Sequence, residues 1–237
     1  YSKTFIETSK PLTSAGLAIE NRMLLLTPFS SKKQLDNRPK IFLTEEEIAN
    51  GKAILEQHKI DFSKKIYMIG VLGSGKNKTY PFPFMAKVLD FIVAKTDATL
   101  LFNYMPSHLK EAQEIFHLCL PETQKNIKID IIPGSIREFL SITYHCDALI
   151  GNEGGAVNMA KALYKPTFNI FSTWIKKEAW NAFEDGTYNV SVHLKDFKPE
   201  LYGEKSAKEM KDKAMELYEN FTPDLVIPSL EKYLEIN

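Results

Sequence analysis

The chain has 237 residues, with 30 basic and 30 acidic side chains and a formal net charge of +0. This balance argues against a nucleic-acid-binding protein, which usually carries a basic excess or a basic patch. No apolar run approaches the ~20 residues of a membrane-spanning helix. With 44% hydrophobic residues, the chain can bury a substantial core.

The amino terminus and the two cysteines bear on the cellular setting. The chain begins at Tyr1 with neither an initiator methionine nor a signal-peptide pattern, so we expect a processed or truncated protein. Cys119 and Cys146 lie in helical apolar patterns, which predicts buried thiols and fits a reducing cytoplasm. The five histidines show no metal-ligand spacing, so no metal is expected.

Residues 1–40 are expected to be a linker or the remnant of a preceding domain. A helix over residues 17–26 is stopped by Pro28, and residues 36–39, Asp-Asn-Arg-Pro, are typical of a linker. Thr44 and Glu47 then have the spacing of a capping box, which predicts that a helix follows Thr44.

Residues 41–192 are predicted to form one Rossmann-like domain, the central unit of the chain, because strands and helices alternate there. The predicted strands cover residues 66–71, 98–102, 127–132, 148–150 and 167–171, and the predicted helices cover residues 82–94, 107–119, 135–145 and 155–163. This alternation predicts an α/β fold with a doubly wound, Rossmann-like parallel sheet. Right-handed crossovers place the strand-to-helix turns along one edge of that sheet.

Residues 193–237 have a different character. After a loop-like segment over 195–202, helices are predicted over 206–218 and 223–234. We therefore expect a pair of C-terminal helices to follow the central unit.

The turn at residues 151–155, Gly-Asn-Glu-Gly-Gly, joins a predicted strand to a small-residue helix. Open α/β sheets bind their ligands at such turns, outside the carboxyl ends of the strands. Gly154 and Gly155 let a ligand approach the backbone, and the helix offers free N–H groups to anionic oxygen atoms. Glu153 adds one carboxylate. The combination suits a sugar nucleotide, which carries both phosphates and hydroxyl groups.

The turn after the first strand resembles a phosphate-binding P-loop in part. Residues 70–76 have the P-loop spacing. Asn77, however, stands where a Ser or Thr would coordinate Mg²⁺, and Pro81 comes too soon for a helix that begins at Lys76. A P-loop nucleoside triphosphatase (NTPase) is therefore disfavoured.

A second interpretation keeps the phosphate chemistry and omits the metal. Gly73, Ser74 and Gly75 form a flexible turn with backbone donors and a hydroxyl group. Lys78 follows and could neutralise a diphosphate leaving group without Mg²⁺. The alternative is a solvated loop with ordinary lysines.

Two further features have both a structural and a functional interpretation. Gly134 and Ser135 are typical of a helix N-cap, and Ser135 and Glu138 have the spacing of a capping box. In the functional interpretation, Gly134 and Ser135 present a backbone edge to a nucleotide base. Trp174 and Trp180 follow the fifth strand and either pack between helices or form the wall of a pocket.

Taken together, these motifs resemble those of family-9 glycosyltransferases, the lipopolysaccharide heptosyltransferase-like enzymes. The resemblance rests on the order and spacing of residues 73–75, 78–81, 134–138, 150–155 and 166–171. It covers roughly residues 40–192, and the two C-terminal helices are consistent with it. The family has the GT-B architecture, in which two Rossmann-like domains face a cleft, and this chain resembles the C-terminal, donor-binding domain.

The resemblance also implies roles for individual residues. Those implied to bind the donor are Gly73, Ser74 and Lys78 at the diphosphate, Gly134 and Ser135 near the base, and Glu153, Gly154, Gly155 and Asn158 at the sugar or phosphate. Two of them depart from the family pattern, which usually has Asp where Glu153 stands and His where Asn158 stands. The donor preference could therefore differ from ADP-heptose.

The reaction that the resemblance implies is inverting, metal-independent sugar transfer from a nucleotide-sugar donor to a lipid-linked or lipopolysaccharide-type acceptor. No cofactor is expected, and the catalytic base of the family comes from an N-terminal domain outside this chain. The implied location is the cytoplasm, including peripheral attachment to the cytoplasmic face of the inner membrane. Two alternatives remain at this point: a non-catalytic sugar-nucleotide-binding module and a nucleotide-sugar epimerase of similar fold.

Overall fold

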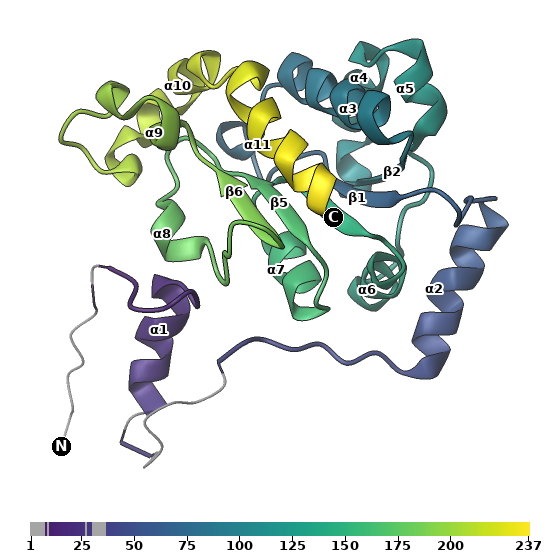
Figure 1. The fold of residues 1–237 in the computed structure, drawn as a ribbon, viewed down its shortest axis with the longest axis horizontal. Helices are drawn as coiled ribbons and strands as arrows, with labels where there is room; N and C mark the ends of the chain where they lie inside the picture. Colours follow the sequence, from purple (N-terminus) through teal and green to yellow (C-terminus); the bar gives the residue numbers. More distant parts are fainter. Residues whose placement is uncertain (1–7, 9, 27, 30–36) are drawn as a thin grey trace.

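The computed structural model describes residues 8, 10–26, 28–29 and 37–237, and part of the expected linker, residues 30–36, lies outside this description. A six-stranded sheet in the order β3-β2-β1-β4-β5-β6 forms its centre, and every neighbouring pair is parallel. The strands are β1 (Ile66–Gly70), β2 (Thr99–Asn103), β3 (Ile127–Lys128), β4 (Ala148–Asn152), β5 (Thr167–Ile170) and β6 (Asn189–Val192). The doubly wound α/β fold predicted from the sequence is confirmed (Figure 1).

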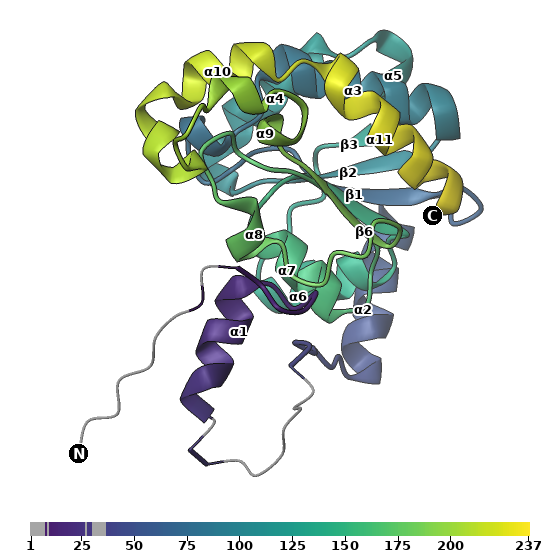
Figure 2. The ribbon, with the colours of Figure 1, turned by 60° about the vertical axis from the view of Figure 1, so that its left-hand side comes forward.

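Helices cover both faces of the sheet, and the two views agree on their placement (Figures 1 and 2). On one face lie α3 (Phe82–Thr96), α4 (Leu109–Leu118), α5 (Pro121–Asn126) and α11 (Pro223–Ile236). On the other lie α6 (Ile136–Tyr144) and α7 (Gly155–Ala162), with α2 (Glu45–Gln57) beside α6. The remaining α-helices are α1 (Leu17–Met23), α8 (Lys177–Trp180), α9 (Leu194–Phe197) and α10 (Ala214–Asn220).

Two hydrophobic clusters hold these layers together. Successive side chains of a strand point to opposite faces of the sheet, so Tyr67 and Ile69 join one cluster while Ile66 and Met68 join the other. Because both faces are covered, all five residues of β1 are buried, as is usual for parallel sheets. The predicted burial of both cysteine thiols is also confirmed.

The C-terminal helices share the core of the central unit. α11 packs on α3 and along β5 and β6, and its Leu230 and Tyr233 belong to the same hydrophobic cluster as α3. Leu225 is partly buried against that cluster. Residues 193–237 therefore support the sheet rather than extending away from it.

Several local predictions were wrong. The strand expected over 127–132 is only Ile127–Lys128, because β3 is an edge strand that pairs with β2 alone. Strand β6 was not predicted, since polar Asn189 and Ser191 leave only a weak apolar signal. The segment expected as a loop over 195–202 contains α9 and the 3-10 turn η4 (Pro199–Leu201), and the helix expected over 206–218 begins as the 3-10 helix η5 (Ala207–Lys213).

The strand order has one consequence for function. The chain builds outward from β1 in one direction and from β4 in the other, so the order reverses between these two central strands. In open α/β sheets, such a reversal leaves a crevice at the carboxyl ends of the two strands, where ligands bind.

Candidate functional site

A cleft of about 800 Å³ lies at the carboxyl edge of the sheet, and Lys78, Glu153, Gly154, Gly155 and Asn158 are among the residues that line it. An adjoining depression of about 350 Å³ shares Lys78, Glu153, Gly154 and Gly155 with the cleft and adds Gly73 and Ser74. Seven of the nine predicted site residues therefore meet around one continuous space. A volume of this size is typical of sites for small ligands and cofactors.

The glycines of the β4–α7 turn serve different purposes. Gly151 has a φ of 136°, and a Cβ atom there would overlap the carbonyl oxygen of Gly70, its partner in the parallel register. Gly154 has a φ of 158°, a backbone conformation that L side chains rarely adopt. A Cβ atom on Gly155, by contrast, would meet nothing within 4 Å. Gly151 thus brings two strands together, whereas Gly155 leaves open space at the cleft.

Helix α7 begins at Gly155 without a capping side chain, because its N-cap residue is Gly154. The first N–H groups of an uncapped helix lack partners, and the helix dipole places partial positive charge there. This helix start lines the cleft. A helix start of this kind is suited to an anionic group, and the predicted role of this turn stays a prediction.

Glu153 lies beside that helix start and has an unusual environment. Its Oε1 atom is buried and has no hydrogen-bond partner within the described part of the chain. Burial raises the pKa of the Glu153 carboxyl, and the nearby charge of Lys78 opposes this rise. A buried polar atom without a partner is costly. A ligand that donates a hydroxyl group to this oxygen would remove the cost.

The β1 turn is folded back on itself. The Gly73 N–H group donates to Thr79 Oγ1 (3.0 Å), and the Thr79 hydroxyl donates to the Gly75 carbonyl (2.9 Å). The prediction that this turn offers free backbone donors is therefore wrong at Gly73, whose N–H group is already used. The Ser74 hydroxyl is exposed and makes no hydrogen bond within the described residues.

The helix after this turn begins at Phe82, following Pro81. Lys76, which would start the helix of a P-loop, instead starts the short 3-10 turn η2 (Lys76–Lys78). The β1 turn therefore lacks the P-loop arrangement, in which an α-helix begins at the lysine of the motif.

Asn152 ties the β1 turn to β4, a role that the sequence interpretation missed. Its buried amide donates to the carbonyls of Gly70 (2.9 Å) and Val71 (3.0 Å), and its Oδ1 accepts the Tyr80 N–H (2.7 Å). One side chain thus fixes both ends of the loop that carries Lys78. The only sequence signal is an asparagine at the end of a buried strand, where an apolar residue is usual.

Trp174 positions Lys78 from the other side. Its indole N–H donates to the Asn77 carbonyl (2.9 Å), which also accepts the Ser172 hydroxyl (2.6 Å). The Lys78 ammonium lies 5.5 Å from the indole ring centroid, and the Lys211 ammonium lies 5.1 Å from it. Such cation–π contacts hold ammonium groups in place. Trp174 and Trp180 both line the cleft, so the pocket-wall interpretation is the correct one.

Gly134 and Ser135 lie apart from the cleft and from the adjoining depression, because neither residue lines them. Ser135 caps α6 by accepting the Glu138 N–H (3.1 Å), as predicted. The Glu138 carboxylate, however, accepts from Gly134 rather than from Ser135, so the predicted reciprocal capping box is wrong.

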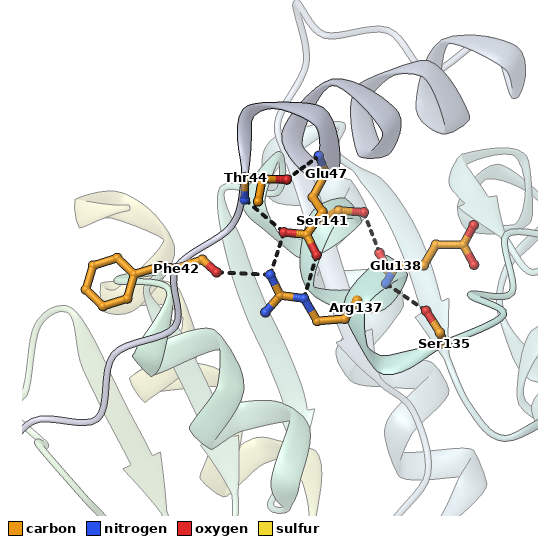
Figure 3. A network of polar contacts seen from close by, with 7 residues as sticks. All are labelled: Phe42, Thr44, Glu47, Ser135, Arg137, Glu138 and Ser141. Carbon is orange, nitrogen blue, oxygen red and sulfur yellow. Dashed lines mark hydrogen bonds and ion pairs between the residues drawn. The ribbon is translucent and has the colours of Figure 1, made fainter.

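Arg137 connects the β3–α6 turn to α2 through hydrogen bonds (Figure 3). Its guanidinium donates to both carboxylate oxygens of Glu47 (2.6 and 2.5 Å) and to the Phe42 carbonyl (3.0 Å). Glu47 also closes the predicted capping box with Thr44, which is confirmed. The Arg137 guanidinium holds the pKa of the Glu47 carboxyl down at about 2. The polar groups of this turn therefore brace α2 against α6.

Within residues 8, 10–26, 28–29 and 37–237, no group of three or more His, Cys, Asp or Glu side chains is arranged to hold a metal ion. No helix in this described part of the chain is long and apolar enough to cross a lipid bilayer.

Comparison with known proteins gives a consistent family resemblance. No protein-family model matches the sequence. Lipopolysaccharide heptosyltransferase 1 of Campylobacter coli is 28% identical over 151 residues, which cover 62% of this chain and 42% of that protein. This chain is therefore similar in sequence to a heptosyltransferase over part of its length.

Two solved structures have a similar fold. The ADP-heptose lps heptosyltransferase II of E. coli has a TM-score of 0.62 at 14% identity, covering 83% of this chain and 53% of that chain. The family 9 glycosyl transferase of Veillonella parvula has a TM-score of 0.63 at 14% identity, covering 90% and 63%. The chain thus spans about half the length of these relatives.

Proposed function

We propose that this chain is the donor-binding domain of a glycosyltransferase that uses a nucleoside-diphosphate sugar. The cleft at the carboxyl edge of the sheet carries the proposal, because it combines Lys78, the uncapped start of α7 and the unpartnered oxygen of Glu153. A diphosphate needs cationic and N–H partners, whereas a sugar needs hydrogen-bond acceptors for its hydroxyl groups. The cleft provides both over a short distance.

In the proposed complex, the diphosphate lies between Lys78 and the first N–H groups of α7. The sugar lies toward Glu153, since the carboxylate would repel phosphate oxygens and accept a hydrogen bond from a sugar hydroxyl group. Lys78 stabilises the charge that develops on the departing diphosphate, so the reaction requires no divalent metal. The E. coli neighbour is described as acting with ADP-heptose, which favours testing ADP first among nucleotides.

We propose inverting transfer to a lipid-linked or lipopolysaccharide-type acceptor at the cytoplasmic face of the membrane, with the general base supplied by residues outside this chain. The chain alone would then bind the donor without turning it over. Sugar transfer catalysed by the purified chain would contradict this part. The intact reading frame offers a second check, because an upstream Rossmann-like half with a cleft-facing acid favours the enzyme over a non-catalytic module.

Nucleotide titration tests the site directly. We expect the purified chain to bind a nucleoside diphosphate, probed with ADP, UDP, GDP and CDP by calorimetry, with equal affinity in EDTA and in Mg²⁺. Lys78→Ala should weaken that binding about 10-fold to 100-fold, because a charged hydrogen bond contributes roughly 1.5–3 kcal/mol.

Lys76→Ala is the matched control. Lys76 belongs to the same 3-10 turn but does not line the cleft, so its removal should leave the affinity unchanged. Equal affinities for the wild type and Lys78→Ala, or binding that requires Mg²⁺, would contradict the assignment. An epimerase would instead convert the nucleotide sugar without an acceptor, which a sugar-composition assay would detect.

A further inference from the structure

In the described part of the chain, two residues that line the cleft each carry a buried oxygen atom without a hydrogen-bond partner. They are Glu153, through Oε1, and Asn169, through Oδ1. Native proteins hold few such groups, because a buried polar atom without a partner is costly. The proposed function gives a role to Glu153. Asn169 is only 2% exposed, and its position in the cleft needs a physical reason of its own.

The other buried polar residues of β5 and β6 already have partners. Asn169 lies on β5 and pairs in parallel register with Ser191 of β6 (Figure 1). The Ser191 hydroxyl donates to the Glu184 carboxylate (2.5 Å), and the Thr167 hydroxyl donates to the Asn189 side chain (2.9 Å). Packing at this side of the sheet therefore satisfies its polar groups, and among these buried residues Asn169 is the exception.

Asn169 directs its side chain toward the face of the sheet that α7 covers. Phe168 and Ile170 belong to the hydrophobic cluster that α3 and α11 share, and successive residues of a strand point to opposite faces. On the α7 side, Lys161 also lines the cleft. Its ammonium donates to the Ala182 carbonyl (2.5 Å) rather than to Asn169.

Glu153 and Asn169 lie at the ends of neighbouring strands. In the parallel register of β4 and β5, Gly151 lies opposite Asn169, and the Glu153 N–H donates to the carbonyl of Ile170 (3.1 Å). Neighbouring strands are roughly 4.8 Å apart, so the two side chains begin close enough to contact one small ligand. Two acceptor oxygen atoms repel phosphate oxygens but accept hydrogen bonds from hydroxyl groups.

We propose that Asn169 is a specificity-determining residue, which accepts a hydrogen bond from one hydroxyl group of the donor sugar while Glu153 accepts one from another. This inference rests on the proposed function, because it takes the cleft to be the donor site. The sugars selected are those with two free hydroxyl groups on the same edge of the ring. A sugar that lacks one of them leaves a buried oxygen atom unpaired and binds less tightly.

Paired titrations of nucleotide sugars and their diphosphates test this role. By calorimetry on the whole chain, we expect at least one of ADP-glucose, UDP-glucose and GDP-mannose to bind about 10-fold more tightly than its own diphosphate. Asn169→Ala should weaken that nucleotide sugar roughly 3-fold to 10-fold and leave the diphosphate affinity unchanged. Its midpoint of unfolding in urea should stay the same or rise, because the free protein loses no hydrogen bond of this side chain.

Ser191→Ala is the matched control. Ser191 is the register partner of Asn169 and is also buried, but its hydroxyl group is paired and it does not line the cleft. This change should lower the urea midpoint and leave both affinities unchanged, which is the opposite pattern. Asn169→Val, which suits a strand, repeats the test if Asn169→Ala fails to fold.

Three results would each overturn the role of Asn169. They are nucleotide sugars that bind no more tightly than their diphosphates, an unchanged nucleotide-sugar affinity in the Asn169 variant, and an equal loss of affinity for nucleotide sugar and diphosphate. In all three, the wild type still binds a diphosphate. Failure of every diphosphate to bind the wild type would instead contradict the donor site itself, so the two failures are distinguishable.

Discussion

Two strand-to-helix turns that both contain glycine and a nearby glutamate differ in how far their polar groups are paired. At the β3–α6 turn, Ser135 caps the helix, Glu138 accepts from Gly134, and Arg137 pairs with Glu47 (Figure 3). At the β4–α7 turn, among the residues that the structure describes, no side chain caps the helix and the Oε1 atom of Glu153 has no hydrogen-bond partner. The first turn is complete without a ligand, and the second is not.

The difference shows how a binding turn can be distinguished from a structural one. Both turns have glycine, a helix N-terminus and a nearby glutamate, so the residue types do not separate them. What separates them is whether each buried or helix-terminal polar group already has a partner. Selection for binding keeps such groups unpaired, at a cost to the stability of the free protein.

Gly151→Ala should produce the largest effect. The new methyl group would overlap the Gly70 carbonyl in a conformation with a φ of 136°. Backbone strain and overpacking each cost roughly 1–3 kcal/mol, so we expect unfolding in urea to show a loss of about 3 kcal/mol.

Gly155→Ala is the matched change within the same turn. Because a Cβ atom there meets nothing within 4 Å, the free energy of unfolding should change by less than about 0.5 kcal/mol. The methyl group should instead weaken nucleotide binding, since it projects into the cleft. If both variants lose the same free energy of unfolding, the expected difference between the tightly packed Gly151 and the open Gly155 is wrong.

Glu153→Gln should have a smaller effect and the opposite sign. Burial raises the pKa of Glu153 in the folded protein, so its contribution to stability is fully present below about pH 4.5 and is lost as pH rises through the folded pKa. The variant should therefore be about 1 kcal/mol more stable than the wild type at pH 7. Urea unfolding between pH 4 and 8 measures this difference, and a less stable variant at pH 7 would mean that the carboxylate already has a partner.

Arg137→Met should have the smallest effect. It removes an exposed ion pair and one hydrogen bond to the backbone, so we expect a slightly lower Tm and unchanged nucleotide affinity. Lys125→Met, which removes the exposed pair with Glu122, is the control for a generic surface charge. If Arg137→Met weakens nucleotide binding about 10-fold while Lys125→Met does not, the β3–α6 turn contributes to the site as the sequence suggested.

Much of the fold was predictable because its signals are local. Apolar strands alternating with helical patterns predicted the parallel sheet, and the edge on which the turns gather followed from crossover handedness. That edge brought Lys78 and Glu153 together, as expected. The edge strands were predicted less well, since β3 has two residues and β6 alternates polar with apolar ones.

The finer features of the site could not be predicted because their partners are distant in the sequence. Glu47 lies 90 residues before Arg137, and this pairing belongs to the packing of α2 on α6. Lys211 lies over the Trp174 ring only because η5 folds back toward it. The burial of Lys161 likewise depends on the residues after α8.

The three hydrogen bonds of Asn152 have a thermodynamic consequence. By holding both ends of the β1 turn against β4, this amide restricts the backbone before a ligand arrives. Ordering a backbone residue costs roughly 1–2 kcal/mol of conformational entropy. A loop ordered during folding does not lose that entropy again on binding, so more of each contact with a phosphate appears as affinity.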